Sequence, residues 1–372
     1  MASSSNSTST SNETLVHEAP CFIHDTNVVR AFRVAPFAPT AFFAITGNFL
    51  VFAVLLRNKT MRKTINFFIA NMAISDSIFT LVYLPRVITI LLFGYRWLLS
   101  DLLGMIFCRM LPFLVEISII VSVLTIVAIT LDRSLTVKFP LRASITTRTC
   151  VFVILVIWVI AISVQTPTLL ATDLDEYQQK MYCIVDFDVK FGAGTAMIYF
   201  KSVFTALYAI PFSITAVLNI ATIVALGRRK IPGNDISGAF RKRREETNRK
   251  VVRMVVVVVS TFLLCWSLYF ILMVLRKNGV HVPCGVLYLR LLLVHFNAAL
   301  TPWLYAMFSE NYRQGFADVL FKWGCRVFAA SVNHPVEDNT TTNSRQISAT
   351  DQDLQLQTLP TSQCGSTIQL LN

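Results

Sequence analysis

A few ionisable side chains interrupt the long apolar stretches of this sequence. Asp76 and Arg86 lie in one such stretch, Glu116 lies in the next, and His295 lies in the last. A charge inside an apolar segment is costly unless it is paired, solvated or bound to a ligand. These residues are therefore candidates for binding a ligand or a cation. Arg86 and Glu116 have opposite charges, so a direct ion pair and separate contacts with a ligand both remain open.

The same residues give little support to catalysis or transport. An intramembrane hydrolase would need paired catalytic groups, and Asp76 has no second aspartate near the middle of an apolar stretch. The sequence contains no metal-type His/Cys cluster and no phosphate-binding loop. We therefore expect a non-enzyme. A transporter would need ionisable residues along a path through several helices, so a membrane transporter is only a minor alternative.

The sequence has seven apolar stretches, three of which contain these residues, and each is long enough to cross a membrane. A helix rises 1.5 Å per residue, so about 20 apolar residues span a bilayer. Hydrophobic residues make up 54% of the chain and charged residues 15%, a balance typical of membrane proteins. The expected spans are 33–56, 65–93, 105–137, 150–171, 197–226, 251–275 and 285–308.

The net charge of +12 is distributed unevenly along the chain. Lysines and arginines gather in 57–63, 138–148 and 228–253, directly beside apolar stretches, whereas 171–196 is acidic. Basic connecting segments remain on the cytoplasmic side of a membrane. We therefore expect an extracellular N-terminus, a cytoplasmic C-terminus and contact with the lipid bilayer. This placement of the charges argues against nucleic-acid binding.

Short motifs follow one another through the seven stretches. They are GNFLV (with Asn48), NMAISD (with Asp76), LDRSLTVKFPL, Trp158, Pro211, FLLCW and NAALTPWLY. On these motifs the chain resembles the rhodopsin-like (class A) G protein-coupled receptors over about 33–325. Its third stretch is similar to that of neuropeptide receptors. The resemblance implies an all-α membrane protein, a seven-transmembrane helix bundle with a short amphipathic eighth helix.

The chain is expected to consist of four segments. Residues 1–32 would form an extracellular tail, glycosylated at Asn6 and Asn12, and 33–308 the seven-transmembrane domain. Residues 309–325 would form an amphipathic helix on the membrane surface, and 326–372 a disordered cytoplasmic tail. Cys325, at the end of the amphipathic helix, is a candidate for palmitoylation. The resemblance implies a location in the plasma membrane.

At the cytoplasmic face, the resemblance assigns coupling to a heterotrimeric G protein to Asp132, Arg133 and Leu141. It assigns the switch between inactive and active states to Pro211, Phe262, Trp266, Thr301, Pro302 and Tyr305. Thr301 stands where the family usually has asparagine, and Asn219 where it usually has tyrosine. Phosphate groups on the tail would recruit arrestin-like regulators.

The resemblance also implies a sodium ion and two disulfides. Sodium would bind at Asp76, Ser122 and Asn297, and the alternative for Asp76 is a protonated structural residue. No other cofactor is expected. The family disulfide would join Cys108 to Cys183. A second would join Cys21 to Cys284, with two free thiols as the alternative.

The outer halves of the helices define the expected ligand pocket. Val115 stands where amine receptors have aspartate, and His295 where opsins have the lysine that binds retinal, so both subclasses lose support. The candidate ligand-binding residues are Arg86, Val115, Glu116, Trp266, Tyr269, Phe270 and His295. An acidic outer vestibule and a charged pocket fit an extracellular peptide best, and within that class a short neuropeptide. A lipid or another non-peptide small molecule is the alternative.

Overall fold

A computed structural model describes residues 21–138, 145–228, 236–278 and 280–332. Within these ranges, seven helical segments are long and apolar enough to cross a membrane, as the sequence predicted. The chain is therefore a multi-pass membrane protein. The helices that contain the spans are α2 with α3 (Asn27–Val34, Phe37–Arg57), α4 (Thr64–Phe93), α5 (Asp101–Lys138), α6 (Thr147–Ala171), α8 with α9 (Thr195–Phe204, Ile210–Arg228), α10 (Ile236–Lys277) and α11 (Cys284–Phe308). Within α10 the span itself covers Arg249–Arg276.

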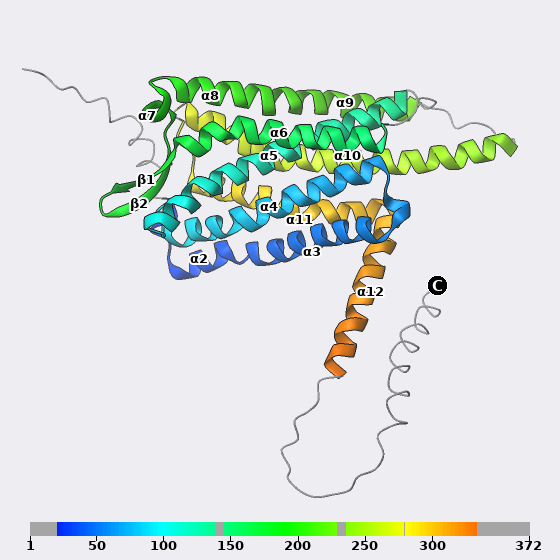
Figure 1. The fold of residues 1–372 in the computed structure, drawn as a ribbon, viewed down its shortest axis with the longest axis horizontal. Helices are drawn as coiled ribbons and strands as arrows, with labels where there is room; N and C mark the ends of the chain where they lie inside the picture. Colours follow the sequence, from blue (N-terminus) through cyan, green and yellow to red (C-terminus); the bar gives the residue numbers. More distant parts are fainter. Residues whose placement is uncertain (1–20, 139–144, 229–235, 279, 333–372) are drawn as a thin grey trace, which may run out of the picture. The chain divides into compact units, whose positions relative to one another are not determined.

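Helix α5 is the central element of the bundle. It packs against α4, α6 and α9 and also contacts α10, and Figure 1 shows these helices running alongside one another. Large apolar side chains such as Leu81, Val159 and Leu264 remain exposed on the outside of the bundle. In a membrane protein this apolar surface faces lipid, so polar groups gather on the inward faces of the helices.

Polar side chains on the inner face of α4 connect it to α5 and α6. Asn71 of α4 donates to the Thr125 hydroxyl (2.8 Å) and accepts from the Trp158 indole of α6 (2.9 Å). One turn further along α4, the Ser75 hydroxyl donates to the Ser118 carbonyl at 2.7 Å. These bonds satisfy groups that lipid could not, and they hold the three helices in register.

The fifth span contains a short π-helix, Thr205–Ala209, between α8 and α9. Pro211 follows it and lacks the N–H that would bond to the carbonyl of Leu207 one turn earlier. The chain widens to an i to i−5 bond, from the Ile210 N–H to the Thr205 carbonyl. Such single-turn bulges occur frequently at functional sites.

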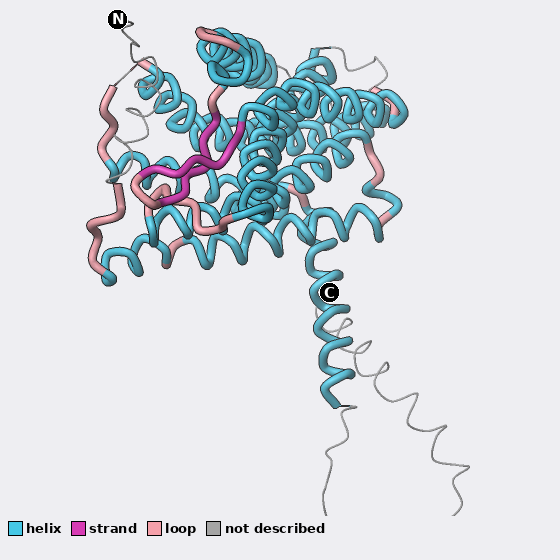
Figure 2. The backbone as a smooth tube through the Cα atoms, turned by 60° about the vertical axis from the view of Figure 1, so that its left-hand side comes forward, coloured by secondary structure: helices cyan, strands magenta, loops and turns pink. Residues whose placement is uncertain are grey.

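A two-stranded antiparallel hairpin, β1 (Thr172–Tyr177) and β2 (Lys180–Val185), lies at one end of the bundle (Figures 1 and 2). The sequence analysis did not predict it. Gln178 and Gln179 make the turn with positive φ angles of 51° and 60°. The short helix α7 (Phe187–Phe191) follows.

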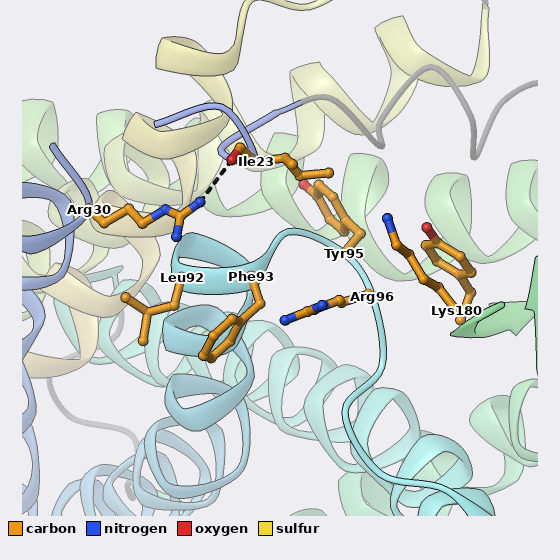
Figure 3. A pocket seen from close by; sticks show the side chains of 8 residues that line it. Ile23, Arg30, Leu92, Phe93, Tyr95, Arg96 and Lys180 are labelled. Atoms are coloured by element: carbon orange, nitrogen blue, oxygen red, sulfur yellow. Dashed lines mark hydrogen bonds between the residues drawn. The ribbon is translucent and has the colours of Figure 1, made fainter. Parts of the chain in front are cut away.

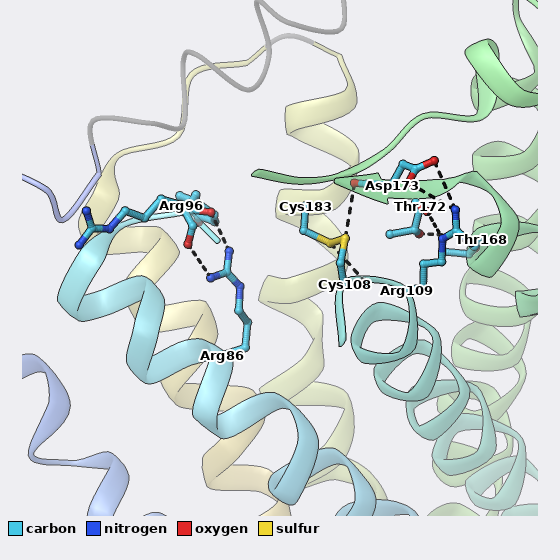
Figure 4. Close-up of a disulfide and its surroundings, with 9 residues drawn as sticks. Arg86, Arg96, Cys108, Arg109, Thr168, Thr172, Asp173 and Cys183 are labelled. Carbon is cyan, nitrogen blue, oxygen red and sulfur yellow. Dashed lines mark hydrogen bonds and ion pairs between the residues drawn. A yellow bond between two sulfur atoms is a disulfide. The ribbon is translucent and has the colours of Figure 1, made fainter. Parts of the chain in front are cut away.

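Both predicted disulfides are present at the hairpin end of the bundle. Cys108 of α5 bonds to Cys183 of β2 (Figure 4), and Cys21 bonds to Cys284 at the start of α11. Arg109 supports the first disulfide, because its Nε donates to the Thr172 carbonyl at 3.0 Å. We call this end, with its two disulfides and the hairpin, the disulfide end.

The opposite end contains the turn η1 (Lys59–Met61) and the start of α12 (Glu310–Val332). Helix α12 reaches Val332, so its last part lies in 326–372, which the sequence analysis assigned to a disordered tail. Likewise α2 begins at Asn27, inside the predicted 1–32 tail.

The Cys108–Cys183 bond makes a prediction about stability. Its cysteines lie 75 residues apart, and removing a native disulfide costs about 2–5 kcal/mol. Cys108→Ala and Cys183→Ala should each lower the melting temperature of the purified protein, and the double variant should melt no lower than the worse single one. Cys150→Ala, which removes a free buried cysteine, is the matched control. If the melting-temperature losses of the two single variants add up in the double variant, the Cys108–Cys183 bond is contradicted.

Candidate ligand-binding and coupling sites

Glu116 lies half-buried where three spans meet near the disulfide end of α5. Its Oε2 accepts from the Tyr208 hydroxyl at 2.9 Å, and its Oε1 accepts from the Tyr269 hydroxyl at 3.2 Å. Tyr208 comes from the π-helix and Tyr269 from α10. Both carboxylate oxygens therefore have a neutral donor, and no cation pairs with Glu116 among the described residues. Such a carboxylate can still attract a ligand cation.

Arg86 does not pair with Glu116 in the described part of the chain. Its guanidinium donates to the carbonyls of Tyr95 (2.7 Å) and Arg96 (3.1 Å) and lies over the Trp97 ring, 4.9 Å from its centroid. Figure 4 shows Arg86 pointing from α4 toward the 94–100 loop. The sequence left open a direct Arg86–Glu116 ion pair or separate ligand contacts, and the described residues do not form the ion pair. Arg86 instead holds the loop between α4 and α5.

His295 is enclosed by aromatic rings instead of lying open on a pocket wall. Its ring stacks on Tyr83 (centroids 5.4 Å apart) and contacts Phe79 (5.1 Å) and Phe37 (5.4 Å). Its Nδ1 lies 2.8 Å from the Leu291 carbonyl, while Nε2 is buried and has no partner within the described residues. His295 thus joins α11 to α4 and α3.

Aromatic side chains connect the Glu116 site to the middle of α10. Tyr208 packs on Phe270 (4.6 Å), and Phe270 lies against Trp266 (6.0 Å). Trp266 in turn contacts Phe262, with ring centroids 5.7 Å apart. Phe262 also contacts Phe212, which directly follows Pro211, at 5.8 Å. Three of the predicted pocket and switch residues, Phe262, Trp266 and Phe270, therefore belong to one continuous packing unit. Val115 is also buried.

The predicted sodium site consists of buried oxygens. The Ser122 hydroxyl donates to Asp76 Oδ1 at 3.4 Å, whereas Asp76 Oδ2 and Asn297 Oδ1 are buried and have no partner among the described residues. Carboxylate and amide oxygens suit a hard cation such as sodium. Asn48 takes no part, because its amide donates to the carbonyls of Ala44 and Ala298. The described residues thus fit the ion.

Asp132 and Arg133 lie at the end of α5 opposite the disulfides and form an ion pair with each other. Asp132 is buried, so the pair is partly withdrawn from solvent. Next to it, the Ser134 hydroxyl lies 2.8 Å from that of Thr222 on α9. Asn219, in the place of the usual tyrosine, donates to Ser260 of α10 at 3.4 Å.

The predicted switch residues of α11 lie at the same end. The Thr301 hydroxyl donates to the Asn297 carbonyl (2.8 Å), and Pro302 is inside the helix. Tyr305 is buried against Tyr312, whose hydroxyl donates to Asn66 of α4 at 3.2 Å. Asn6, Asn12 and Leu141 lie outside the described residues, and the side chain of Cys325 is not described.

Comparison with known proteins decides the family. Residues 47–305 match the model of the family described as "7 transmembrane receptor (rhodopsin family)". The chain belongs to this family. This is a family of receptors, not of enzymes.

The relatives of this receptor include several neuropeptide receptors. It is 30% identical to the allatostatin-A receptor of Bombyx mori over 78% of this chain and 80% of that protein. It is 27% identical to the RYamide receptor of Tribolium castaneum over the same shares, and 30% identical to the KiSS-1 receptor of Mus musculus over 76% of this chain and 73% of that one.

Sequence reasoning missed three residues that contact the predicted ligand-binding residues: Tyr208 at Glu116, Arg290 at Tyr269 and Tyr83 at His295. Tyr208 lies three positions before Pro211, and the π-helix that turns it toward Glu116 leaves no periodic signal. Arg290 lies over the Tyr269 ring, 5.4 Å from its centroid. An arginine inside the seventh apolar stretch was a visible signal, of the same kind that identified Arg86.

The bonds around Glu116 can be tested by double-mutant cycles. Glu116→Ala with Tyr208→Phe should be non-additive in unfolding free energy by roughly 0.6–1.7 kcal/mol, the range for hydrogen bonds inside membrane proteins. Glu116→Ala with Arg86→Met should be additive, because the two residues do not touch. Unfolding of the purified receptor in detergent mixtures gives both values. Coupling only in the Arg86 cycle would show that the two charges pair after all.

Proposed function

We propose that this chain is a plasma-membrane receptor that binds an extracellular peptide and activates a heterotrimeric G protein. Membership of the rhodopsin family supports the coupling. The observation that carries the ligand class is the half-buried Glu116 carboxylate, held by two tyrosine hydroxyls. A ligand arginine or amine would replace these neutral donors with a charged one, which forms a stronger hydrogen bond.

Two observations support an extracellular N-terminus and a cytoplasmic C-terminus. Cystines form in oxidising compartments, and Cys21–Cys284 and Cys108–Cys183 both lie at the disulfide end. The basic connecting segments follow the positive-inside pattern at the other end. On this orientation, Glu116 is reached from outside the cell and Arg133 from inside.

A peptide ligand, a short neuropeptide, is favoured by the relatives' names and by the charges of the pocket. The allatostatin-A, RYamide and KiSS-1 receptors are named for their ligands. The pocket region offers a carboxylate, Glu116, and two guanidinium groups, Arg86 and Arg290. These groups can bind a basic side chain on one part of a ligand and carbonyl oxygens on another.

Activation would pass along the aromatic unit from the pocket toward Arg133. A ligand that displaces Tyr208 or Tyr269 from Glu116 repacks Phe270, Trp266 and Phe262. Asn219 bonds α9 to α10, so the repacking of these side chains would reach this contact and move the two helices apart. Arg133 would then separate from Asp132 and become available to the G protein. Sodium bound at Asp76, Ser122 and Asn297 would favour the inactive packing. Arrestin-like regulators would act on the tail, which lies outside the described residues.

A lipid or small molecule is the second candidate ligand. A cavity of about 400 Å³ between α4 and α5 supports it, because its wall is almost entirely apolar, with Leu81, Leu111 and Leu114 among its residues. Several of its side chains are exposed on the outside of the bundle, where lipid can enter.

Nucleotide exchange is the deciding experiment. The receptor is reconstituted with several heterotrimeric G proteins, and an amidated peptide library is compared with a lipid library. Peptides should stimulate exchange, and Arg133→Ala should abolish it while leaving peptide binding unchanged, because the two sites lie at opposite ends of α5. Arg57→Ala, a basic residue at the end of α3, is the control. Stimulation by lipids alone would show that the ligand is a lipid and not a peptide. Full nucleotide exchange with Arg133→Ala would refute the coupling role of Arg133.

A further inference from the structure

A second, smaller cavity lies at the disulfide end. Its volume is about 150 Å³. Three segments that are distant in the sequence form its wall: Arg30 from α2, Tyr95 and Arg96 from the loop after α4, and Lys180 from β2. Figure 3 shows the side chains of Arg30, Arg96 and Lys180 around it. The Cys21–Cys284 disulfide and the hairpin bring these segments together.

The charges on this wall have one sign. No acidic residue lines the cavity, and no ion pair to Arg30, Arg96 or Lys180 occurs within the described ranges. Of the acids at this end, Asp25 pairs with Arg33 and Asp173 with Arg109, while Asp175 and Glu176 of β1 stand opposite Tyr182 and Met181 in the hairpin. The vestibule that the sequence predicted to be acidic therefore contains a cationic cavity.

Several donors at the cavity have no partner in the described part of the chain. The Nε atoms of Arg30 and Arg96 and the hydroxyl of Tyr95 are buried and unbonded. Arg30 is held in place, because its guanidinium donates to the Ile23 carbonyl at 2.8 Å, and Arg96 lies over the Phe93 ring, 5.1 Å from its centroid. Burial raises the pKa of Tyr95, so its hydroxyl stays protonated and can donate. Buried donors without acceptors are unfavourable unless a ligand supplies the acceptor.

We propose that this cavity binds a carboxylate of the extracellular peptide, an aspartate or glutamate side chain or a terminal carboxylate. Two guanidinium groups, an ammonium and a phenol match the oxygens of such a group. The volume equals that of about five water molecules in the liquid, enough for one acidic side chain and too little for a folded partner. The inference rests on the proposed function: the peptide would place an acid here and a basic group at Glu116.

The selectivity that follows is for peptides with both charges. A cationic cavity at the entrance concentrates anions and repels purely basic peptides. The deeper carboxylate of Glu116 attracts basic groups and repels anions. A ligand with an acidic and a basic residue satisfies both sites, and a ligand with only one charge satisfies one.

Binding to the cavity can be measured without knowing the natural ligand. Full-length receptor in phosphatidylcholine nanodiscs is titrated with acetylated tetraglutamate and with tetraglutamine, and affinity is read from the rise in melting temperature. Tetraglutamate should bind about tenfold more tightly at low salt, with the difference shrinking at high salt. Equal affinity of the two peptides would overturn the proposal.

Variants then locate the effect. Arg96→Gln and Lys180→Gln should each reduce the preference for tetraglutamate severalfold, whereas Lys190→Gln on α7, a cation outside the cavity, should not. Charge reversal with Arg96→Glu should shift the preference toward tetralysine. An unchanged preference in Arg96→Gln and Lys180→Gln would refute the assignment.

Anionic lipid is the remaining source of such a group. If phosphatidylserine in the nanodisc abolishes the peptide preference of the unaltered receptor, and Arg96→Gln removes that effect, the cavity binds a lipid headgroup and the peptide proposal is wrong. This readout needs no G protein. Loss of nucleotide exchange together with intact tetraglutamate binding would therefore refute the proposed coupling and leave the anion site standing.

Discussion

The whole bundle depends on satisfying polar groups where no water is available. Lipid offers no hydrogen bonds, so each polar side chain in a span needs a partner on another helix or on its own backbone. In this receptor several of these partners lie along α5: Thr125 for α4, Ser118 for Ser75, and Glu116 for the tyrosines of the fifth and sixth spans. The same face therefore both positions the helices and contains the Glu116 carboxylate.

Much of the fold could be predicted because membrane insertion leaves a strong record in the sequence. Each span is a long apolar segment, and cysteines at one end pair where oxidation is possible, so seven spans and both disulfides followed from the sequence and the family resemblance. The β1–β2 hairpin was missed. Its turn places Gln178 and Gln179 at positive φ, where glycine or asparagine is the usual signal, and the strands show no clear alternation.

The candidate site was only partly predictable, because side-chain partners depend on rotations that the sequence does not record. Arg86 and Glu116 were singled out from the sequence as opposite charges within neighbouring spans, but Arg86 turns toward the loop carbonyls and Glu116 toward Tyr208 and Tyr269. The π-helix decides the direction of Tyr208, and its cause, Pro211, acts on the backbone alone. Opposite charges on neighbouring helices therefore suggest a pair, and local geometry determines whether it forms.

One proline thereby affects both the hydrogen bond at Glu116 and the aromatic packing of the sixth span. Without the widened turn that Pro211 imposes, Tyr208 would follow ordinary helical spacing and would not face Glu116 as it does. The residue after the proline, Phe212, packs on Phe262 of the sixth span, within the same aromatic unit as Trp266. A change in the hydrogen bond at Glu116 and a change in the packing at Phe262 are thus connected through one short irregular segment. A regular fifth helix would lack this connection between Glu116 and Phe262. The irregular turn provides it, although the turn disrupts the regular backbone hydrogen bonds of the helix.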